Sequence, residues 1–272
     1  MTNIAETLER NGYVVFDQIL VHDICESLKK RACDLVKNYK DKGNRTIFST
    51  LSHKHDKDKY FLESSDKLHF FWEEEAFDKL GSLGYDKMKA INKIGHGLHL
   101  HDKIFSEFSE MSLLSDLIKK SSYFAEPQIA QSMYIFKQAK IGGEVLCHQD
   151  STFIHSKPNK VLALWFALED ANEDNGCLWG IPGSYTGEAH QLFSLEGGSC
   201  SFEPKVGFDY PLGEAVPLPV KKGSVIMFHG LFPHFSYPNR SDQSRQAFTL
   251  HYVDRKNSYL KSNWNQSKRL LN

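Results

Sequence analysis

A histidine and an aspartate stand two residues apart in His148-Gln149-Asp150. On a β-strand, residues i and i+2 project from the same face, so the imidazole of His148 and the carboxylate of Asp150 would point together while Gln149 faces away. These are two of the three ligands of the facial triad that binds non-haem Fe(II) and leaves coordination positions open. The motif is also compatible with an ordinary hydrogen-bonded pair, so the metal hypothesis needs a third ligand.

Two histidines could supply that ligand, because both follow an apolar run that predicts a strand at residues 225–228. His229 ends the run and precedes Gly230, so it could project into the mouth of a barrel. His234 lies eleven residues before Arg245, and a hairpin between them could place both on one inner wall. The residues alone leave both histidines open.

Arg245 adds a reason to expect a carboxylate ligand. The planar fork of arginine can bind both oxygens of a carboxylate at once. 2-Oxoglutarate would chelate iron through its keto acid end and reach Arg245 with its far carboxylate. The alternative for Arg245 is a surface salt bridge.

The sequence pattern differs between the N-terminal and C-terminal parts of the chain. The first 125 residues predict mainly helix, with helices at 23–39 and 109–121, a short strand at 13–16 and a polar loop at 41–66. From residue 131 the sequence predicts short strands separated by Gly, Pro and Asn turns, at 133–136, 161–168, 225–228 and 247–253. The pattern is typical of a β-sandwich or jelly roll with helices packed on one side.

The ordered motifs resemble the phytanoyl-CoA dioxygenase family, and most closely its phytanoyl-CoA dioxygenase domain-containing proteins. The resemblance rests on segments 91–96 (INKIGH), 131–138 (QSMYIFKQ), 148–150 (HQD), 169–171 (EDA) and 175–184 (NGCLWGIPGS), followed by His234 and Arg245. It spans roughly residues 90–255. It implies a double-stranded β-helix, a cupin-like jelly roll, with iron held at its open end.

The resemblance also implies the site. His148, Asp150 and His234 would be the iron ligands, and Arg245 would hold the tail of 2-oxoglutarate. The other cofactor-binding residues expected from matching positions are Lys93, Met133, Gln149, Trp165 and Ser236. Trp165 also fits a plain core position. The implied cofactors are Fe(2+), 2-oxoglutarate as cosubstrate and O2, with ascorbate as a possible stimulant.

We expect a single dioxygenase domain over residues 1–272, with helical support at 1–125, the jelly-roll core at 126–255 and a C-terminal tail at 256–272. A long loop at 194–210 is expected over the mouth of the barrel. This loop and the helical region would choose the substrate.

A second histidine cluster, His96, His99 and His101 with Asp102, could in principle bind zinc. It lacks the His-Glu-x-x-His spacing of metalloproteases and has no accompanying cysteines. We expect one of these histidines to line the cosubstrate pocket beside Lys93 and the others to support local structure.

Composition excludes several classes of function. The net charge of −1 does not favour nucleic-acid binding. No apolar run is long enough for a membrane span. Five cysteines without a Cys-x-x-Cys pair argue against a disulfide framework. We expect a cytoplasmic monomer acting on a small-molecule substrate.

The function expected is therefore Fe(II)/2-oxoglutarate-dependent hydroxylation of a small or medium organic substrate, with release of succinate and CO2. Two alternatives are a cupin-type metal-binding protein and a non-catalytic family member that binds 2-oxoglutarate. Arg245 argues against the first alternative, and the complete set of ligands gives the second no support.

Overall fold

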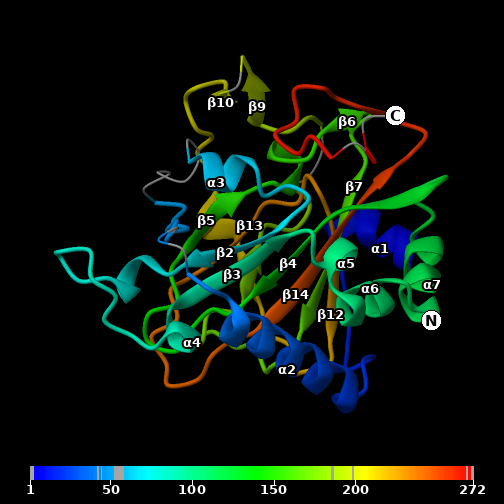
Figure 1. Cartoon of the computed structure of the whole chain (residues 1–272). Helices are drawn as coiled ribbons and strands as arrows, with labels where there is room; N and C mark the ends of the chain where they lie inside the picture. Colours follow the sequence, from blue (N-terminus) through cyan, green and yellow to red (C-terminus); the bar gives the residue numbers. More distant parts are fainter. Residues whose placement is uncertain are drawn as a thin grey trace.

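The computed structural model describes residues 3–41, 43, 45–51, 58–184, 187–197, 199–267 and 269–270. Its main sheet is antiparallel and has seven strands (Figure 1). In spatial order its strands are β1 (Tyr13–Phe16), β12 (Val225–His229), β7 (Val161–Ala167), β14 (Ala247–Asp254), β4 (Pro127–Ile135), β3 (Ile91–His96) and β2 (Leu68–Trp72). From β1 to β4 the neighbours in this order are far apart in the chain, as expected for a jelly roll, whereas β4, β3 and β2 are consecutive strands.

A smaller sheet packs against the long one. Its order is β11 (Val216–Leu218), β8 (Leu178–Gly180), β13 (His234–Ser236) and β5 (Val145–His148). Two further strand pairs are β9 (Leu192–Glu196) with β10 (Ser199–Glu203), and β6 (Ser156–Lys157) with β15 (Ser258–Tyr259). Side chains such as Trp165 and Phe228 from the long sheet and Phe232 from the loop before β13 form one apolar cluster between the two sheets.

Helices cover the outer face of the long sheet. Those that pack on this face are α1 (Ile4–Asn11), α2 (His22–Asn38), α4 (Lys87–Ala90), α5 (Leu98–His101), α6 (Lys103–Ser109) and α7 (Ser112–Ser121). The short helix α3 (Lys59–Leu62) and the 3-10 turns η2 (Glu74–Ala76), η3 (Asp150–Thr152) and η4 (Leu212–Glu214) lie elsewhere in the chain. Figure 1 shows α2, α5, α6 and α7 together on one side of the sheet. Leu28 of α2 and Phe105 of α6 belong to the same core as Phe166 and Phe248 of the sheet. The mainly β fold with a jelly-roll core and helices on one side is therefore confirmed.

Strand β7 explains why the sequence there is apolar throughout. Its even residues, such as Leu164 and Phe166, pack under the helices, while its odd residues, such as Ala163 and Trp165, face the smaller sheet. Since both faces are covered, no polar alternation is needed. The inward row of such strands is the wall on which a site can be built.

Most predicted elements are found, with corrected ends. The strand at 13–16 matches β1, and the helix at 23–39 matches α2. The helix predicted at 109–121 starts only at Ser112, because α6 ends at Ser109 and Glu110-Met111 separates the two helices. The loop at 41–66 contains α3, and residues 42, 44 and 52–57 of it lie outside the described part. The long loop at 194–210 is wrong in part, since it contains the β9–β10 hairpin.

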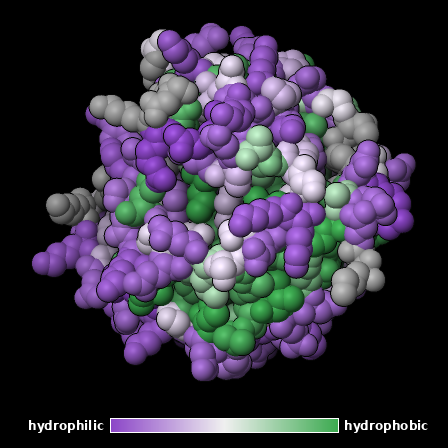
Figure 2. All heavy atoms as spheres, turned by 90° about the vertical axis from the view of Figure 1, so that its right-hand side faces the viewer, coloured by the Kyte–Doolittle hydropathy of each residue, from purple (hydrophilic) through white to green (hydrophobic). Residues whose placement is uncertain are grey.

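Hydrophilic side chains cover most of the face in Figure 2, and hydrophobic ones gather in its lower part. Within the described residues, no helix has both the length and the apolar character needed to cross a bilayer.

Candidate iron centre

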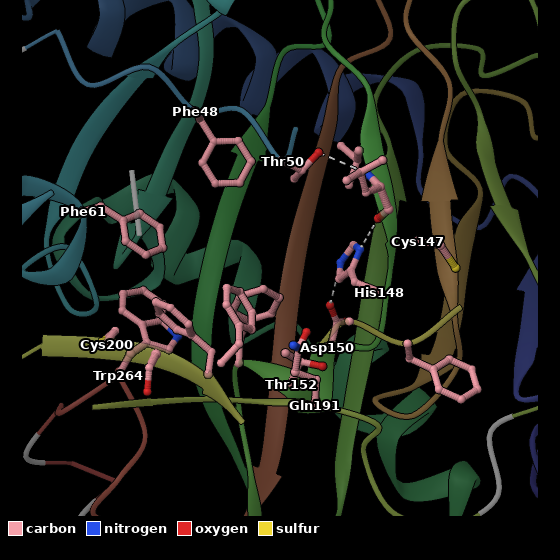
Figure 3. Close-up of a pocket in the computed structure, with 18 of the residues that line it drawn as sticks. Phe48, Thr50, Phe61, Cys147, His148, Asp150, Thr152, Gln191, Cys200 and Trp264 are labelled. Atoms are coloured by element: carbon pink, nitrogen blue, oxygen red, sulfur yellow. Dashed lines mark hydrogen bonds and ion pairs between the residues drawn. The ribbon is translucent and has the colours of Figure 1, made fainter. Parts of the chain in front are cut away.

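A pocket of about 780 Å³ opens into the barrel between the two sheets. Figure 3 shows His148 and Asp150 on its wall, with Phe61 and Trp264 on the opposite side. Its other lining residues include Lys93, His96, Gln131 and Met133 from β3 and β4, and Phe193, Phe202, Phe208 and Tyr210 from the β9–β10 hairpin and the segment after it. His96 beside Lys93 fulfils the expectation that one histidine of the second cluster lines this space.

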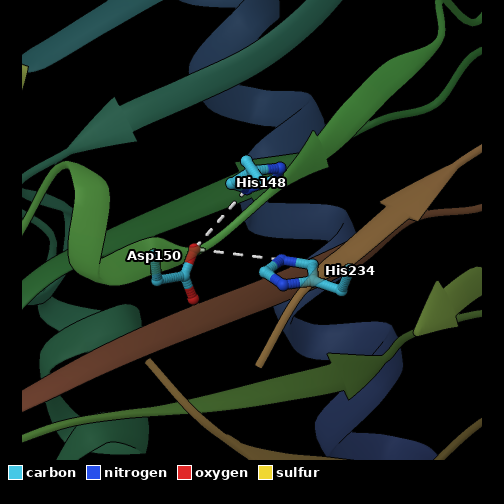
Figure 4. Close-up of side chains that lie close together, drawn as sticks. All are labelled: His148, Asp150 and His234. Atoms are coloured by element: carbon cyan, nitrogen blue, oxygen red, sulfur yellow. Dashed lines mark ion pairs between the residues drawn. The ribbon is translucent and has the colours of Figure 1, made fainter. Parts of the chain in front are cut away.

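His148 and Asp150 on this wall and the neighbouring His234 have the geometry of a metal site. The ligand atoms of His148, Asp150 and His234 all lie within 4.8 Å of one another (Figure 4). Nε2 of His148 is 3.6 Å and Nε2 of His234 is 3.8 Å from Oδ1 of Asp150. Among the described residues this is the one group of three histidines, cysteines or acids with such spacing. His96, His99 and His101 do not form a second one.

Two short strands and one turn bring the triad together. His148 ends β5, and His234 is its partner across the β5–β13 pair. Asp150 does not continue the strand but opens the 3-10 turn η3. The extended backbone of Gln149 still turns His148 and Asp150 to the same side, as the spacing predicts.

Main-chain carbonyls fix the orientation of both imidazoles. Nδ1 of His148 donates to the carbonyl of Leu146 (2.8 Å), and Nδ1 of His234 donates to that of Phe232 (3.0 Å). Each hydrogen bond leaves the lone pair of Nε2 directed toward Asp150. This is the tautomer that a metal-binding histidine requires.

The electrostatics favour the metal-binding protonation states of Asp150 and His234. Burial alone would raise the pKa of Asp150, but His251, His234 and His148 hold it well below its usual range. Burial, together with neighbouring His148, lowers the pKa of His234 to about 4. At neutral pH the site therefore offers one carboxylate and a neutral His234.

His251 is a neighbour of the triad that sequence reasoning missed. Its Nε2 lies 3.0 Å from Oδ2 of Asp150, the carboxylate oxygen that is not shared with His148 and His234. It sits on the inward row of β14, two residues after Thr249. Its position in the alternating strand could have predicted that the side chain points inward. Only the sheet register shows that this histidine reaches Asp150.

The structure separates the two candidates for the third ligand. His229 ends β12 and points elsewhere: its Nε2 is hydrogen-bonded to the hydroxyl of Tyr123, and its Nδ1 accepts from the amide of Leu231 (3.0 Å). The amide of Phe232 donates to the carbonyl of His229 (2.8 Å), which forms the turn that brings His234 back along the wall.

Gln149 lies on the opposite side of the chain from the triad. Its amide donates to the carbonyl of Leu231 (2.7 Å) and accepts from the amide of His190 (2.9 Å). Both ends of the side chain are thus bound within the protein. A contact of Gln149 with a cofactor would have to come from its main chain.

The remaining predicted site residues fall into two groups. Lys93 and Met133 line the pocket, with Nζ of Lys93 lying 3.9 Å from Sδ of Met133 and 3.3 Å from the ring centre of Phe48. Trp165, Ser236 and Arg245 are at most 2% exposed and are not among the described residues that line it. The guanidinium of Arg245 lies 5.3 Å from the ring centre of Trp165.

Several buried polar atoms in this region lack a protein partner. Nε of Arg245 donates to the carbonyl of Gly176 (2.9 Å), but its Nη1 has no partner, and neither do Nε1 of Trp165 and Oγ1 of Thr249. Thr249 pairs with Trp165 on one side and Met133 on the other. Buried polar groups are rarely left unsatisfied. The donors present therefore fit a carboxylate-bearing ligand beside the triad.

Comparison with known proteins agrees with this geometry. The family model of phytanoyl-CoA dioxygenase (PhyH) matches residues 8–247. The chain belongs to the phytanoyl-CoA dioxygenase family. The resemblance seen in the sequence is confirmed, and membership identifies a 2-oxoglutarate-dependent non-haem iron dioxygenase with iron and 2-oxoglutarate as cofactors.

Relatives of similar length support the assignment. A Caenorhabditis elegans homologue of phytanoyl-CoA dioxygenase domain-containing protein 1 is 40% identical over 98% of this chain and 96% of its own. Phytanoyl-CoA dioxygenase of Arabidopsis thaliana is 39% identical over 95% and 91%.

Solved structures show the same fold at low identity. EctD from S. alaskensis has a TM-score of 0.66 at 18% identity over 98% of this chain and 85% of its own. The α-ketoglutarate-dependent carbocyclase SnoK has the same TM-score and identity over 99% and 89%.

Proposed function

We propose that this dioxygenase hydroxylates a small or medium-sized, largely apolar organic substrate, with release of succinate and CO2. The observation that carries the proposal is the triad of His148, Asp150 and His234, oriented by main-chain carbonyls at the wall of a pocket with an aromatic lining. When bound, iron and 2-oxoglutarate supply the oxidising power that places one atom of O2 in a substrate C–H bond.

The chain's own residues would bind and orient the two cofactors. The triad would hold iron on one face and leave its other positions open. Arg245 and Ser236 would receive the distal carboxylate of 2-oxoglutarate, and Trp165 and Met133 would form the walls around its carbon chain. Lys93 would place a positive charge on the pocket side. The unpartnered Nη1 of Arg245 and Nε1 of Trp165 support this arrangement.

The pocket lining indicates what kind of substrate fits. Phe153, Phe193, Phe202, Phe208 and Tyr210 surround the space in front of His148 and Asp150. Such a lining favours apolar or aromatic molecules because it offers dispersion contacts and few hydrogen bonds. Since these rings come from the η3 turn and from the β9–β10 hairpin with the segment after it, that hairpin is where substrate choice would reside.

The test is a substrate screen that measures succinate release in the presence of Fe(II), ascorbate and 2-oxoglutarate. Matched panels of apolar ring compounds and of polar compounds of the same size would be compared, with Asp150→Ala as the metal-site control. We expect substrate-stimulated succinate release from the apolar panel that disappears in Asp150→Ala. Stimulation confined to the polar panel would contradict the substrate class. Iron-bound protein that never turns over 2-oxoglutarate would favour the non-catalytic alternative.

A further inference from the structure

Lys137 is a buried lysine that the proposed site has not used. Only 2% of it is exposed, and it follows β4 with a backbone φ of 38°, in the left-handed region. A residue with a side chain rarely adopts that conformation, and such positions gather at functional sites. Its carbonyl accepts hydrogen bonds from the amide of Arg245 (3.1 Å) and from the side chain of Asn239 (3.1 Å), so the surrounding structure holds it in place.

The amine of Lys137 is hydrogen-bonded to the hydroxyl of Ser236. Nζ lies 2.6 Å from the carbonyl of Gly143 and 2.9 Å from Oγ of Ser236. In its ammonium form Nζ can only donate, so Oγ of Ser236 is then the acceptor, and its own proton remains to be donated. Ser236 stands two residues after the iron-ligand candidate His234 on β13. Its proton is thus available for a ligand carboxylate bound between Ser236 and Arg245.

Arg245 and Lys137 place two cationic groups in one buried region. Gly176 lies between them: its carbonyl accepts from Nε of Arg245, and a Cβ added to it would lie 2.7 Å from Cε of Lys137. Burial and the charge of Arg245 hold the pKa of Lys137 well below its usual value, and the charge of Glu73 opposes them only in part.

Glu73 is the buried acid on the other side of this region. Its Oε2 accepts from the amide of Gly143 (3.0 Å), so the Gly143 peptide lies between Glu73 and the amine of Lys137. Burial raises the pKa of Glu73 and lowers that of Lys137, so the buried region by itself disfavours the charged form of both groups. An added carboxylate would favour the ammonium form of Lys137.

We propose that Lys137 is a positioning residue for the distal carboxylate of 2-oxoglutarate, which orients the Ser236 hydroxyl and adds positive charge beside Arg245. The inference rests on the proposed 2-oxoglutarate site. Its consequence is selectivity: Lys137 should matter for a 2-oxo acid with a second carboxylate and should matter little for one without it.

The experiment compares 2-oxoglutarate with 2-oxopentanoate, which has the same carbon chain and no distal carboxylate. Each is titrated by calorimetry into the full chain loaded with Mn(II). In Lys137→Met, affinity for 2-oxoglutarate should fall about 10- to 100-fold, as expected when a hydrogen bond to a charged group is lost. Affinity for 2-oxopentanoate should change less than about threefold on the same reasoning. Equal weakening of both ligands would show a merely structural role.

Variants of Glu73 separate charge from folding. Lys137→Met leaves the carboxyl of Glu73 buried without its cation, which should lower thermal stability. The double variant Lys137→Met/Glu73→Gln removes both groups, so it should be more stable than Lys137→Met. It should still discriminate poorly between 2-oxoglutarate and 2-oxopentanoate. Glu73→Gln alone should keep or strengthen binding of 2-oxoglutarate. If Glu73→Gln weakens that binding as much as Lys137→Met does, the Gly143 turn is a scaffold and the proposal fails.

A double-mutant cycle with Ser236→Ala tests the route of the effect. If Lys137 acts through Ser236, the two single losses in 2-oxoglutarate affinity will not add, whereas additive losses contradict that route. Wild-type protein that binds Mn(II) but no 2-oxoglutarate would refute the proposed function itself, which distinguishes that failure from a failure of the Lys137 proposal.

Discussion

Arg245→Ala removes the guanidinium that lies beside Trp165 on the inner wall. The side chain is 2% exposed, and burial lowers its pKa to about 10, so it is charged at neutral pH. Nε is committed to the carbonyl of Gly176, while Nη1 has no protein partner. The part of the guanidinium left for a ligand is therefore its outer end.

The expected loss follows from that division. Removing one partner of a buried charge pair costs about 2–5 kcal/mol. Because Nε already serves the protein, we expect the lower part of that range, about 2–3 kcal/mol, or roughly a 30- to 150-fold weaker affinity for 2-oxoglutarate. The metal should bind as in the wild type, since Arg245 contacts none of the three ligands in the described contacts.

Calorimetric titration of 2-oxoglutarate into Mn(II)-loaded protein measures this loss directly. The matched control is Arg240→Ala, an exposed arginine whose guanidinium pairs with Glu75 (2.6 Å) and whose removal should leave the affinity unchanged. A thermal melt measures how much stability Arg245→Ala loses with the hydrogen bond from Arg245 to the carbonyl of Gly176. Folded Arg245→Ala with wild-type affinity for 2-oxoglutarate would refute the assignment of Arg245.

Three other predictions concern metal binding, stability at acidic pH and the substrate. His234→Ala should lose most Fe(II) affinity and uncoupled 2-oxoglutarate turnover, whereas His229→Ala should change both only modestly. Metal titration measures this after circular dichroism has shown that both variants are folded. Loss of metal in His229→Ala with retention in His234→Ala would contradict the assignment. Burial lowers the pKa of His229 to about 4. Between its ordinary value and about 4 the unfolded chain carries a proton that the folded one lacks, so stability should fall as the pH falls, by roughly 3 kcal/mol over that window. Denaturant unfolding at several pH values measures this, and His229→Phe should flatten the slope. Phytanoyl-CoA should stimulate 2-oxoglutarate turnover poorly, because the described pocket lining offers only Lys93 and Lys205 as lysines for its phosphates; turnover equal to that of a phytanoyl-CoA hydroxylase would contradict this.

Local patterns determined much of the site. The His-x-Asp spacing fixed the common direction of His148 and Asp150, because an extended Gln149 alternates side chains whatever follows it. Long apolar runs such as 161–168 and 247–253 predicted β7 and β14, since covered strands must be apolar. The strands β8 and β13 have three residues each and lack such a long apolar run, so their bounds carried a weaker signal.

Tertiary structure decided which groups meet across the sheets. The choice of His234 over His229 depended on the turn before β13 and on pairing with β5, because both histidines follow the same strand. His251 reaches Asp150, and Lys137 reaches Ser236, across 101 and 99 residues of chain. No local pattern encodes such contacts, since sheet register and packing set them. The sequence by itself specified His148 and Asp150 as a candidate metal-binding pair, and the fold specified which histidine joins them and which neighbours orient the group.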